Sequence, residues 1–305
     1  MTQFLPLPLA GGGRGKGGQR AARLTPGLLT ALQITPLTLL LAAFVVIPLL
    51  AIIVVSFLDY DSVRILPNFV LTNYTDLLFS SVTWRTYFNT LRYAAIVWAI
   101  TLVLGFFVAY VLAFVIRGAV MQTALFLVCT IPFLTSNIIR MIAWVPFLGR
   151  EGLANRALLA TGLIDKPLEW LLFSDFAVIL AFVHLYTLFM VVPIFNTMTR
   201  IDRSLIEAAI DAGAGPFQVV RDIIIPLCKS GIAIGTIFVV TLVMGDFATV
   251  RLMSGGQSAS VGLMIANGIG LLQYPAACAN AVILLALVLL LIGAILRVVD
   301  IRKEL

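Results

Sequence analysis

The segment "IEAAIDAGAGPFQVVRDIIIPL", residues 206–227, decides how the rest of the chain is interpreted. It carries four charged side chains, Glu207, Asp211, Arg221 and Asp222, and it is interrupted by glycine and proline. The chain on either side is apolar over about 20 residues, which is the length that a helix needs to cross a membrane. A polar segment between two such runs predicts an exposed connection between membrane spans.

The composition agrees with a membrane protein. Hydrophobic residues make up 61% of the 305 residues and charged residues only 11%, whereas soluble domains are about 25% charged. The net charge of +6 therefore informs on membrane topology rather than on nucleic-acid binding, and we expect no nucleic-acid partner. A single histidine, His184, and three widely spaced cysteines argue against a zinc cluster and a His-based triad, so we expect no bound metal.

Six apolar runs predict an all-α membrane protein with six transmembrane helices. The runs are residues 36–58 and, approximately, 93–116, 124–148, 176–199, 231–250 and 275–296. The third and fifth runs are interrupted by Arg140 and Asp246, and Pro132 predicts a kink in the third.

The distribution of charge predicts the orientation of these spans. An even number of spans places both termini on one side of the membrane. Four basic residues precede the first span and two acidic residues follow it: Arg14, Lys16, Arg20 and Arg23, then Asp59 and Asp61. Because basic residues stay on the cytoplasmic side, we expect cytoplasmic N- and C-termini and a cytoplasmic 206–227 segment.

The first 35 residues are Gly-rich and basic, and they contain too few apolar residues to form a core. We expect a flexible cytoplasmic tail at 1–35 and a six-span membrane domain at 36–305. The first apolar run is too long for a cleavable signal peptide. The stretch "GGGRGKGG" lacks the first glycine and the Ser or Thr of a phosphate-binding loop, because Ala10 and Gly17 occupy those positions.

Local signals predict two short helices around the polar segment, in a connecting loop at about 200–228. Ser204 and Glu207 match a capping box for the first helix. Gly213 suits the position after its last turn. Pro216 suits the first turn of a second helix, which Pro226 ends or kinks.

The segment resembles the EAA motif in membrane subunits of binding-protein-dependent ABC importers. That motif reads E-A-A, three residues, Gly, nine residues and I-x-L-P. It falls here on Glu207, Ala208, Ala209, Gly213, Ile223, Ile225 and Pro226, with Ile225 where leucine is usual. The resemblance implies the type I ABC importer permease fold.

The resemblance also implies a role for the segment. In that family the loop contains a coupling helix that docks into a cleft on a cytoplasmic ABC ATPase dimer. The implied ATPase-coupling residues are Glu207, Ala208, Ala209, Gly213, Ile223 and Pro226. A short exposed helix with small residues suits a groove on a partner. ATP and magnesium would be used by that partner, so this chain is expected to be a transport subunit with no cofactor and no enzymatic activity.

Further stretches resemble the spermidine/putrescine-type permeases of the bacterial inner (plasma) membrane. They are "NYTDLLF" at 73–79, "RTYFNTLRYA" at 85–94, "IPFLTSNIIRMIAW" at 131–144 and "GLIDKPL" at 162–168. This resemblance implies a polyamine solute, an external solute-binding protein and a second permease subunit in a heterodimer. The same group includes permeases for other small solutes, so an amino-acid-like solute, an opine, a phosphonate, thiamine or iron stays open.

Five side chains within the spans are candidates for the solute path, because polar and ionisable groups are costly in a membrane. The carboxylate of Asp246 can attract an ammonium group, and Trp144 offers a π-face to a cation. Arg140, His184 and Tyr186 are the other three.

Each candidate also has a purely structural interpretation. Asp246 can pair with Arg140 or Arg251, and Arg140 can extend to the membrane interface. His184 can form a hydrogen bond between helices, and Trp144 can belong to an interfacial aromatic belt. The segment at 149–170 predicts a small amphipathic helix that either docks the binding protein or anchors the chain at the membrane surface.

Two other classes of protein compete with the permease interpretation. A secondary transporter driven by an ion gradient is expected to have repeated halves and several buried ion ligands. An intramembrane enzyme needs a polar catalytic set such as H-E-x-x-H or paired aspartates. One histidine and one intramembrane aspartate, far apart in sequence, favour neither class.

Overall fold

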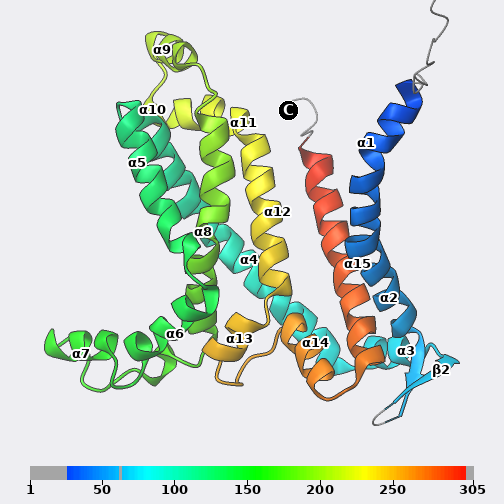
Figure 1. The fold of residues 1–305 in the computed structure, drawn as a ribbon. Helices are drawn as coiled ribbons and strands as arrows, with labels where there is room; N and C mark the ends of the chain where they lie inside the picture. Colours follow the sequence, from blue (N-terminus) through cyan, green and yellow to red (C-terminus); the bar gives the residue numbers. More distant parts are fainter. Residues whose placement is uncertain (1–25, 62–63, 300–305) are drawn as a thin grey trace, which may run out of the picture. The chain divides into compact units, whose positions relative to one another are not determined.

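The computed structural model describes residues 26–61 and 64–299, in which helices dominate and the only sheet has two strands (Figure 1). The contacts separate two units, one ending at Leu50 and one beginning at Ala51. The all-α architecture predicted from the apolar runs is confirmed.

The described part of the first unit is one apolar helix. Helix α1 (Pro26–Leu41) continues through a π-helical turn (Ala42–Val46) into α2 (Ile47–Ser56), which crosses into the second unit. The stretch Gln33–Ser56 is long and apolar enough to cross a membrane. Residues 1–25 of the predicted tail lie outside the described residues. The rest of that tail begins α1, since proline is favoured in a first helical turn.

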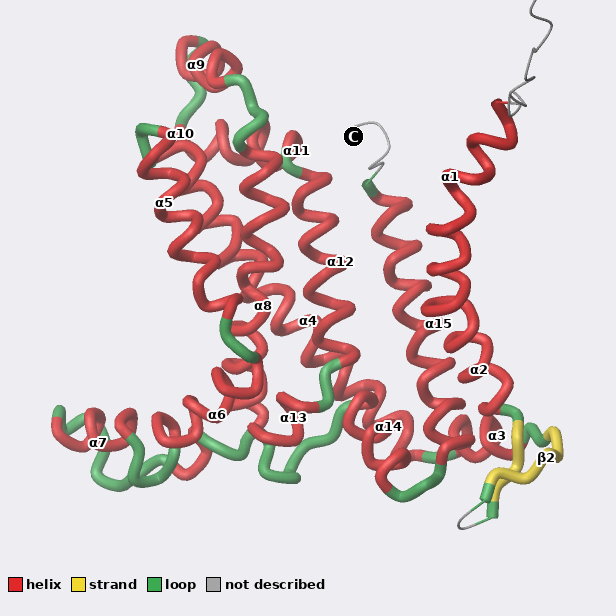
Figure 2. The backbone as a smooth tube through the Cα atoms, viewed as in Figure 1, coloured by secondary structure: helices red, strands yellow, loops and turns green. Residues whose placement is uncertain are grey.

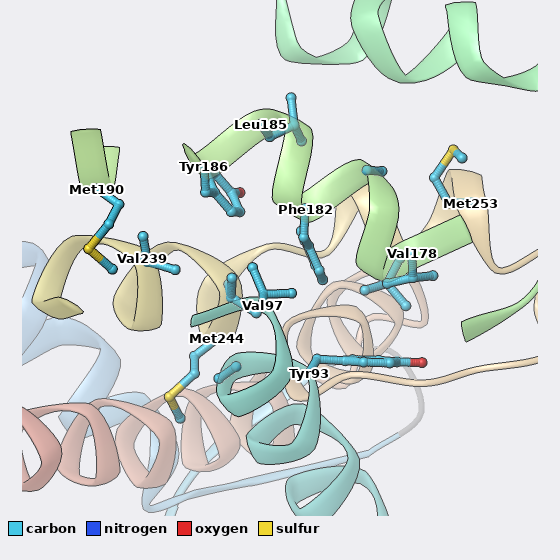
Figure 3. Packing of buried hydrophobic residues seen from close by; sticks show 14 of the residues in the cluster. Tyr93, Val97, Val178, Phe182, Leu185, Tyr186, Met190, Val239, Met244 and Met253 are labelled. Atoms are coloured by element: carbon cyan, nitrogen blue, oxygen red, sulfur yellow. The ribbon is translucent and has the colours of Figure 1, made fainter. Parts of the chain in front are cut away.

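Three helices form the centre of the second unit: α4 (Ser81–Tyr110), α8 (Asp175–Met198) and α12 (Lys229–Gly245). A π-helical turn (Val111–Val115) extends α4. Apolar side chains from all three helices meet in the core (Figure 3). They include Tyr93, Val97, Phe182, Met190 and Val239, all of which are almost fully buried.

Glycines let these three helices approach closely. A Cβ atom added at Gly231 would lie 2.6 Å from the carbonyl oxygen of Pro193. One added at Gly235 would lie 3.2 Å from the Cα atom of Met190. Small residues at such spacing are typical of helix contacts within membranes.

We expect Gly231→Ala to destabilise the bundle, because the added methyl group meets backbone atoms of α8 that cannot rotate away. Overpacking of this kind costs about 1–3 kcal/mol. The control is Gly293→Ala in α15, where nothing lies within 4 Å of the added atom. Thermal unfolding of the purified protein checks the pair; equal unfolding temperatures for the two variants would contradict the expectation.

The remaining elements connect and flank this centre (Figure 2). The elements that precede α8 in the sequence are β1 (Leu58–Tyr60), β2 (Ile65–Phe69), α3 (Thr72–Phe79), α5 (Ala119–Thr130), a 3-10 turn (Ile131–Leu134), α6 (Asn137–Leu148), α7 (Leu153–Ala160) and a 3-10 turn (Glu169–Leu171). Later come α9 (Arg203–Asp211), α10 (Pro216–Val219), a π-helical turn (Val220–Ile224), α11 (Ile225–Leu227), α13 (Ala248–Met253), α14 (Val261–Gly270) and α15 (Tyr274–Val298). Helices α9, α10 and α11 lie at one end of the bundle, and α7, α13 and α14 lie at the opposite end (Figure 1).

Four described helices can each cross a membrane, and two bent pairs raise the number to six if each pair counts as one span. The predicted fourth and sixth spans match α8 and α15. The predicted second span begins too late, because Ser80 caps α4 by accepting a hydrogen bond from the Thr83 amide at 3.3 Å. Arg85 and Arg92 therefore lie within α4 rather than in a connecting segment.

The third and fifth predicted spans are the two bent pairs. The pair Ala119–Leu134 and Asn137–Ala160 meets at 87° just after the 3-10 turn that contains Pro132, where a kink was predicted. The third predicted span is thus a bent pair of helices, as the kink predicted at Pro132 implies. The pair Pro216–Leu227 and Lys229–Gly245 meets at 70°. Helix α12 ends at Gly245, so Asp246 follows the helix instead of interrupting it.

Candidate coupling segment and solute path

Helix α9 carries the E-A-A residues, and its first turn differs from the prediction. The carboxylate of Asp202 accepts a hydrogen bond from the Ser204 amide at 3.0 Å, which makes Asp202 the capping residue. That bond holds the pKa of Asp202 below its usual range. The capping box of Ser204 and Glu207 is therefore wrong: the helix starts two residues earlier, and Glu207 is exposed.

The end of α9 matches the prediction. Gly213 has a φ of +88°, which a glycine adopts without strain. Its amide donates to Ile210 at 2.9 Å, and the amide of Ala214 donates to Ala209 at 2.9 Å. These two bonds form a Schellman motif, which closes the helix and turns the chain toward α10.

The second half of the segment is a short, irregular helix. Pro216 stands in its first turn as predicted, and the preceding Gly215 amide donates to the side chain of Gln218 at 2.8 Å. Ile223 and Pro226 are half-buried near its end, and the helix stops at Leu227 before the 70° turn into α12. The segment is thus joined directly to a central helix.

The surface of this segment combines apolar and small side chains. Leu205, Ile210 and Phe217 are 50%, 57% and 74% exposed. Glu207 and Ala208 are exposed beside them, and Ala209 is half-buried. Exposed apolar side chains at the tip of a loop are typical of a surface that binds another protein.

Contacts behind this surface attach α9 to the bundle. The guanidinium of Arg203 donates to the carbonyl of Ala113, in the π-helical turn that extends α4, at 3.4 Å. Ile206 and Ala209 pack against the buried core. These contacts connect α9 to α4, and the chain through α10 and α11 connects it to α12.

Three of the five solute-path candidates lie together. The indole N–H of Trp144 donates to Nδ1 of His184 at 2.9 Å, and the two rings meet edge to face at 5.6 Å. Arg140 lines the same hollow of about 280 Å³. The bend after Pro132 makes this possible, since it brings α6 across to α8.

Tyr186 and Asp246 form a second group. The Tyr186 hydroxyl donates to the Asp246 carboxylate at 2.6 Å. The same carboxylate accepts the Thr249 amide at 2.9 Å and the Thr249 hydroxyl at 2.6 Å, and so caps α13. Among the described residues Asp246 has no ion pair, and Arg251 bonds to Asn267 instead. The structural interpretation that paired Asp246 with an arginine is wrong.

Comparison with known proteins now identifies the family. Residues 101–302 match the family described as "Binding-protein-dependent transport system inner membrane component". The chain belongs to this family. It is therefore a multi-pass inner-membrane permease subunit of an ABC importer, and it is not an enzyme.

Individual relatives of the permease agree with this assignment. It is 34% identical over 270 residues to the spermidine/putrescine transport system permease protein PotB of Escherichia coli (strain K12), covering 87% of this chain and 97% of that protein. It is 29% identical over 266 residues to the osmoprotective compounds uptake permease protein GgtC of Synechocystis, covering 84% and 94%.

Solved structures confirm the fold of the permease. A bacterial ABC transporter involved in the import of the acidic polysaccharide alginate aligns with a TM-score of 0.71 at 16% identity, covering 88% of this chain and 94% of that one. The type I importer fold expected from the EAA motif is confirmed. Within the described part of the permease, no group of three or more His, Cys, Asp or Glu side chains can hold a metal.

Sequence reasoning missed one polar cluster in the permease. The carboxylate of Asp175, at the start of α8, accepts hydrogen bonds from Arg92, Tyr93 and Ser258. The first two belong to α4, and Ser258 belongs to the loop between α13 and α14. The available signal was the pair Ser174–Asp175 at the start of an apolar run, in which Ser174 caps α8.

The same loop has further bonds to α4. The side chain of Asn89 donates to the carbonyl of Ala259 at 2.7 Å, and the amide of Val261 donates to the hydroxyl of Thr90 at 2.9 Å. The cluster around Asp175 therefore joins α4, α8 and the α13–α14 loop at the end of the bundle opposite to α9.

Proposed function

We propose that this permease forms one half of the solute path of an ATP-driven importer, with α9 as its contact to a cytoplasmic ATPase dimer. The observation that carries the proposal is the exposed α9 surface, which combines the E-A-A residues with Leu205 and Ile210. A second, related permease supplies the other half in a heterodimer. An external binding protein delivers the solute, and ATP and magnesium are bound by the ATPase.

The mechanism follows from the two attachments of α9. When ATP closes the ATPase dimer, α9 moves with the ATPase surface. Arg203 transmits that movement to α4, and α10 and α11 transmit it to α12. Both central helices pack against α8, which carries His184 and Tyr186, so the movement reaches the solute path. In this arrangement the termini and α9 are cytoplasmic, and the opposite end faces outward.

The proposed solute is a polyamine. The support is the similarity to relatives named for spermidine and putrescine, at 34% identity over most of the chain. Asp246 adds a physical argument. Its Oδ1 atom accepts a single bond, from the Thr249 amide, and a carboxylate oxygen has two lone pairs. One acceptor position is thus left for an ammonium group. A different small solute is the alternative, since the relative GgtC is named for osmoprotective compounds.

The outward end also offers a place for the binding protein. Helix α7 and the following chain up to Trp170 project from the bundle beside α6 (Figure 1). Leu153, Leu163 and Trp170 are more than half exposed there. We propose that this segment contacts the loaded binding protein. Anchoring to the membrane surface is the alternative.

We expect Asp246→Asn to reduce ATP-dependent spermidine uptake about tenfold, which corresponds to about 1.4 kcal/mol of lost attraction for the cation. Asparagine caps a helix as well as aspartate does, so α13 should stay in place while the charge is lost. The measurement is uptake into proteoliposomes that contain the permease with its ATPase, second permease and binding protein. An unchanged unfolding temperature is the control, and full uptake by the variant would remove Asp246 from the path.

A further inference from the structure

Among the described residues Arg140 has no carboxylate partner, and it lies in a bent pair of helices that is apolar enough to count as a membrane span. The described ion pairs join Arg92 to Asp175, Arg150 to Glu169 and Arg221 to Asp222. Arg140 bonds to the side-chain oxygen of Asn137, one helical turn earlier. Its Nε atom is buried and has no partner. A buried guanidinium nitrogen without an acceptor is costly, so an acceptor is expected to bind there.

His184 lines the same hollows as Arg140 and carries a second N–H group. Its Nδ1 atom accepts the indole N–H of Trp144 at 2.9 Å, so Nδ1 carries a lone pair. In a neutral imidazole the proton then resides on Nε2, which becomes a hydrogen-bond donor. Trp144 thus fixes the ring so that Arg140 and His184 both offer N–H groups.

The space beside these donors is small and mostly apolar, with Cys129 and Thr187 in the wall of one hollow. Two hollows of about 280 and about 200 Å³ share Arg140 and His184 in their walls. Ala143, Trp144 and Phe147 complete the first hollow. Both volumes lie below the range of about 300–1,000 Å³ that is usual for whole small-molecule ligands. The space therefore suits one terminal group of a larger molecule.

The walls of the hollow carry an arginine and a histidine but no carboxylate. This combination determines which kind of terminal group can bind there. An ammonium group would be repelled by Arg140, and neither hollow has a carboxylate in its walls to attract it. A carboxylate or phosphate oxygen can accept from both side chains, and arginine binds such groups with charge-assisted hydrogen bonds. This chemistry differs from that of Asp246, which stands with Tyr186 and Thr249 in a separate group.

We propose that Arg140 and His184 bind one oxyanion, a carboxylate or a phosphate group, in this hollow. The group comes either from the headgroup of an anionic phospholipid or from a soluble molecule in the path. The proposal goes beyond the proposed polyamine transport, because a polyamine has no such group. The permease role stands whichever source supplies the oxyanion.

The test uses the complete transporter complex in lipid nanodiscs and measures its thermal unfolding temperature. Inorganic phosphate is titrated in discs of zwitterionic phosphatidylcholine, against chloride at equal ionic strength, and then in discs that contain phosphatidylglycerol. A bound ligand raises the unfolding temperature in a saturable way. We expect such a rise with phosphate, and Arg140→Gln should raise the half-saturating phosphate concentration at least tenfold.

Two further variants make the result specific. Arg150→Gln removes a largely exposed arginine from the segment that follows α6, and it should leave the phosphate titration unchanged. Arg140→Lys keeps the charge but loses the forked geometry, and should bind phosphate more weakly than the native protein and more tightly than Arg140→Gln.

The two lipid conditions distinguish the sources. If phosphatidylglycerol raises the unfolding temperature through Arg140 and abolishes the effect of phosphate, a lipid headgroup fills the hollow. If phosphate acts equally in both lipids, the site takes a group from a soluble molecule. If neither ligand has an effect that depends on Arg140, the proposal is overturned. Spermidine uptake, measured separately, reports on the transport function alone.

Discussion

Replacing Gly213 with valine is expected to weaken coupling between the ATPase and the solute path about 5- to 30-fold. Gly213 has a φ of +88°, and nothing lies within 4 Å of a Cβ atom added there. The effect therefore comes from the backbone. A left-handed conformation costs an L-residue about 1–2 kcal/mol, and a β-branched residue is poorly tolerated there. An energy of this size changes an equilibrium by about 5- to 30-fold, so the Schellman turn should open and α9 should lose its position.

The measurement is substrate-stimulated ATP hydrolysis and uptake by the reconstituted complex, with ATPase binding measured separately. Gly215→Val is the matched control, because Gly215 has a φ of −72° and an ordinary contact to Gln218. Gly213→Asn should retain most coupling, since asparagine tolerates positive φ. If Gly213→Val couples as well as Gly215→Val does, α9 is not the coupling helix.

Replacing Asp175 with asparagine is expected to release the α13–α14 loop from α4 and α8. The carboxylate accepts from Arg92, Tyr93 and Ser258. Asparagine offers one oxygen and turns an N–H₂ group toward these donors, so at least one of them loses its partner. Hydrogen bonds to charged groups contribute about 1.5–3 kcal/mol each, but Asp175 and Arg92 are 42% and 43% exposed, so solvent reduces that value.

The release should appear as a lower unfolding temperature and as faster hydrogen exchange at the Val261 amide, which donates to Thr90. Glu169→Gln is the control. It breaks the exposed ion pair with Arg150, at 3.6 Å, and such pairs contribute little. Unchanged exchange at Val261 in Asp175→Asn would show that the loop is held by Asn89 and Thr90 without the carboxylate.

Much of the candidate coupling segment was predictable because its signals are local. Gly213 and Pro216 act through their own backbone geometry, which depends on neighbours within a few residues. The N-cap residue of α9 was predicted incorrectly, although its signals are equally local. Ser204 and Asp202 both suit the N-cap position. Because α9 begins at Arg203, Asp202 is the residue that caps it.

The helix boundaries were less predictable where polar side chains occur. The N-terminal part of α4 contains Arg85 and Arg92, and these polar side chains are the reason that the predicted span began only near residue 93. Its polar side chains are satisfied by distant partners: Arg92 bonds to Asp175, and Asn89 bonds to Ala259. Contacts across more than 80 residues cannot be inferred from a window of about 20.

The sequence alone determined that this chain is a helical membrane protein and a permease subunit of an ABC importer. Apolar length sets the spans, and the E-A-A spacing identifies the family, because both are properties of consecutive residues. Only the tertiary structure decided how the polar side chains are used. It turned α6 against α8 so that Trp144 meets His184, and it made Asp246 the cap of α13. The reason is physical: a polar group in a membrane must find a partner, and packing of separate helices decides which one it finds.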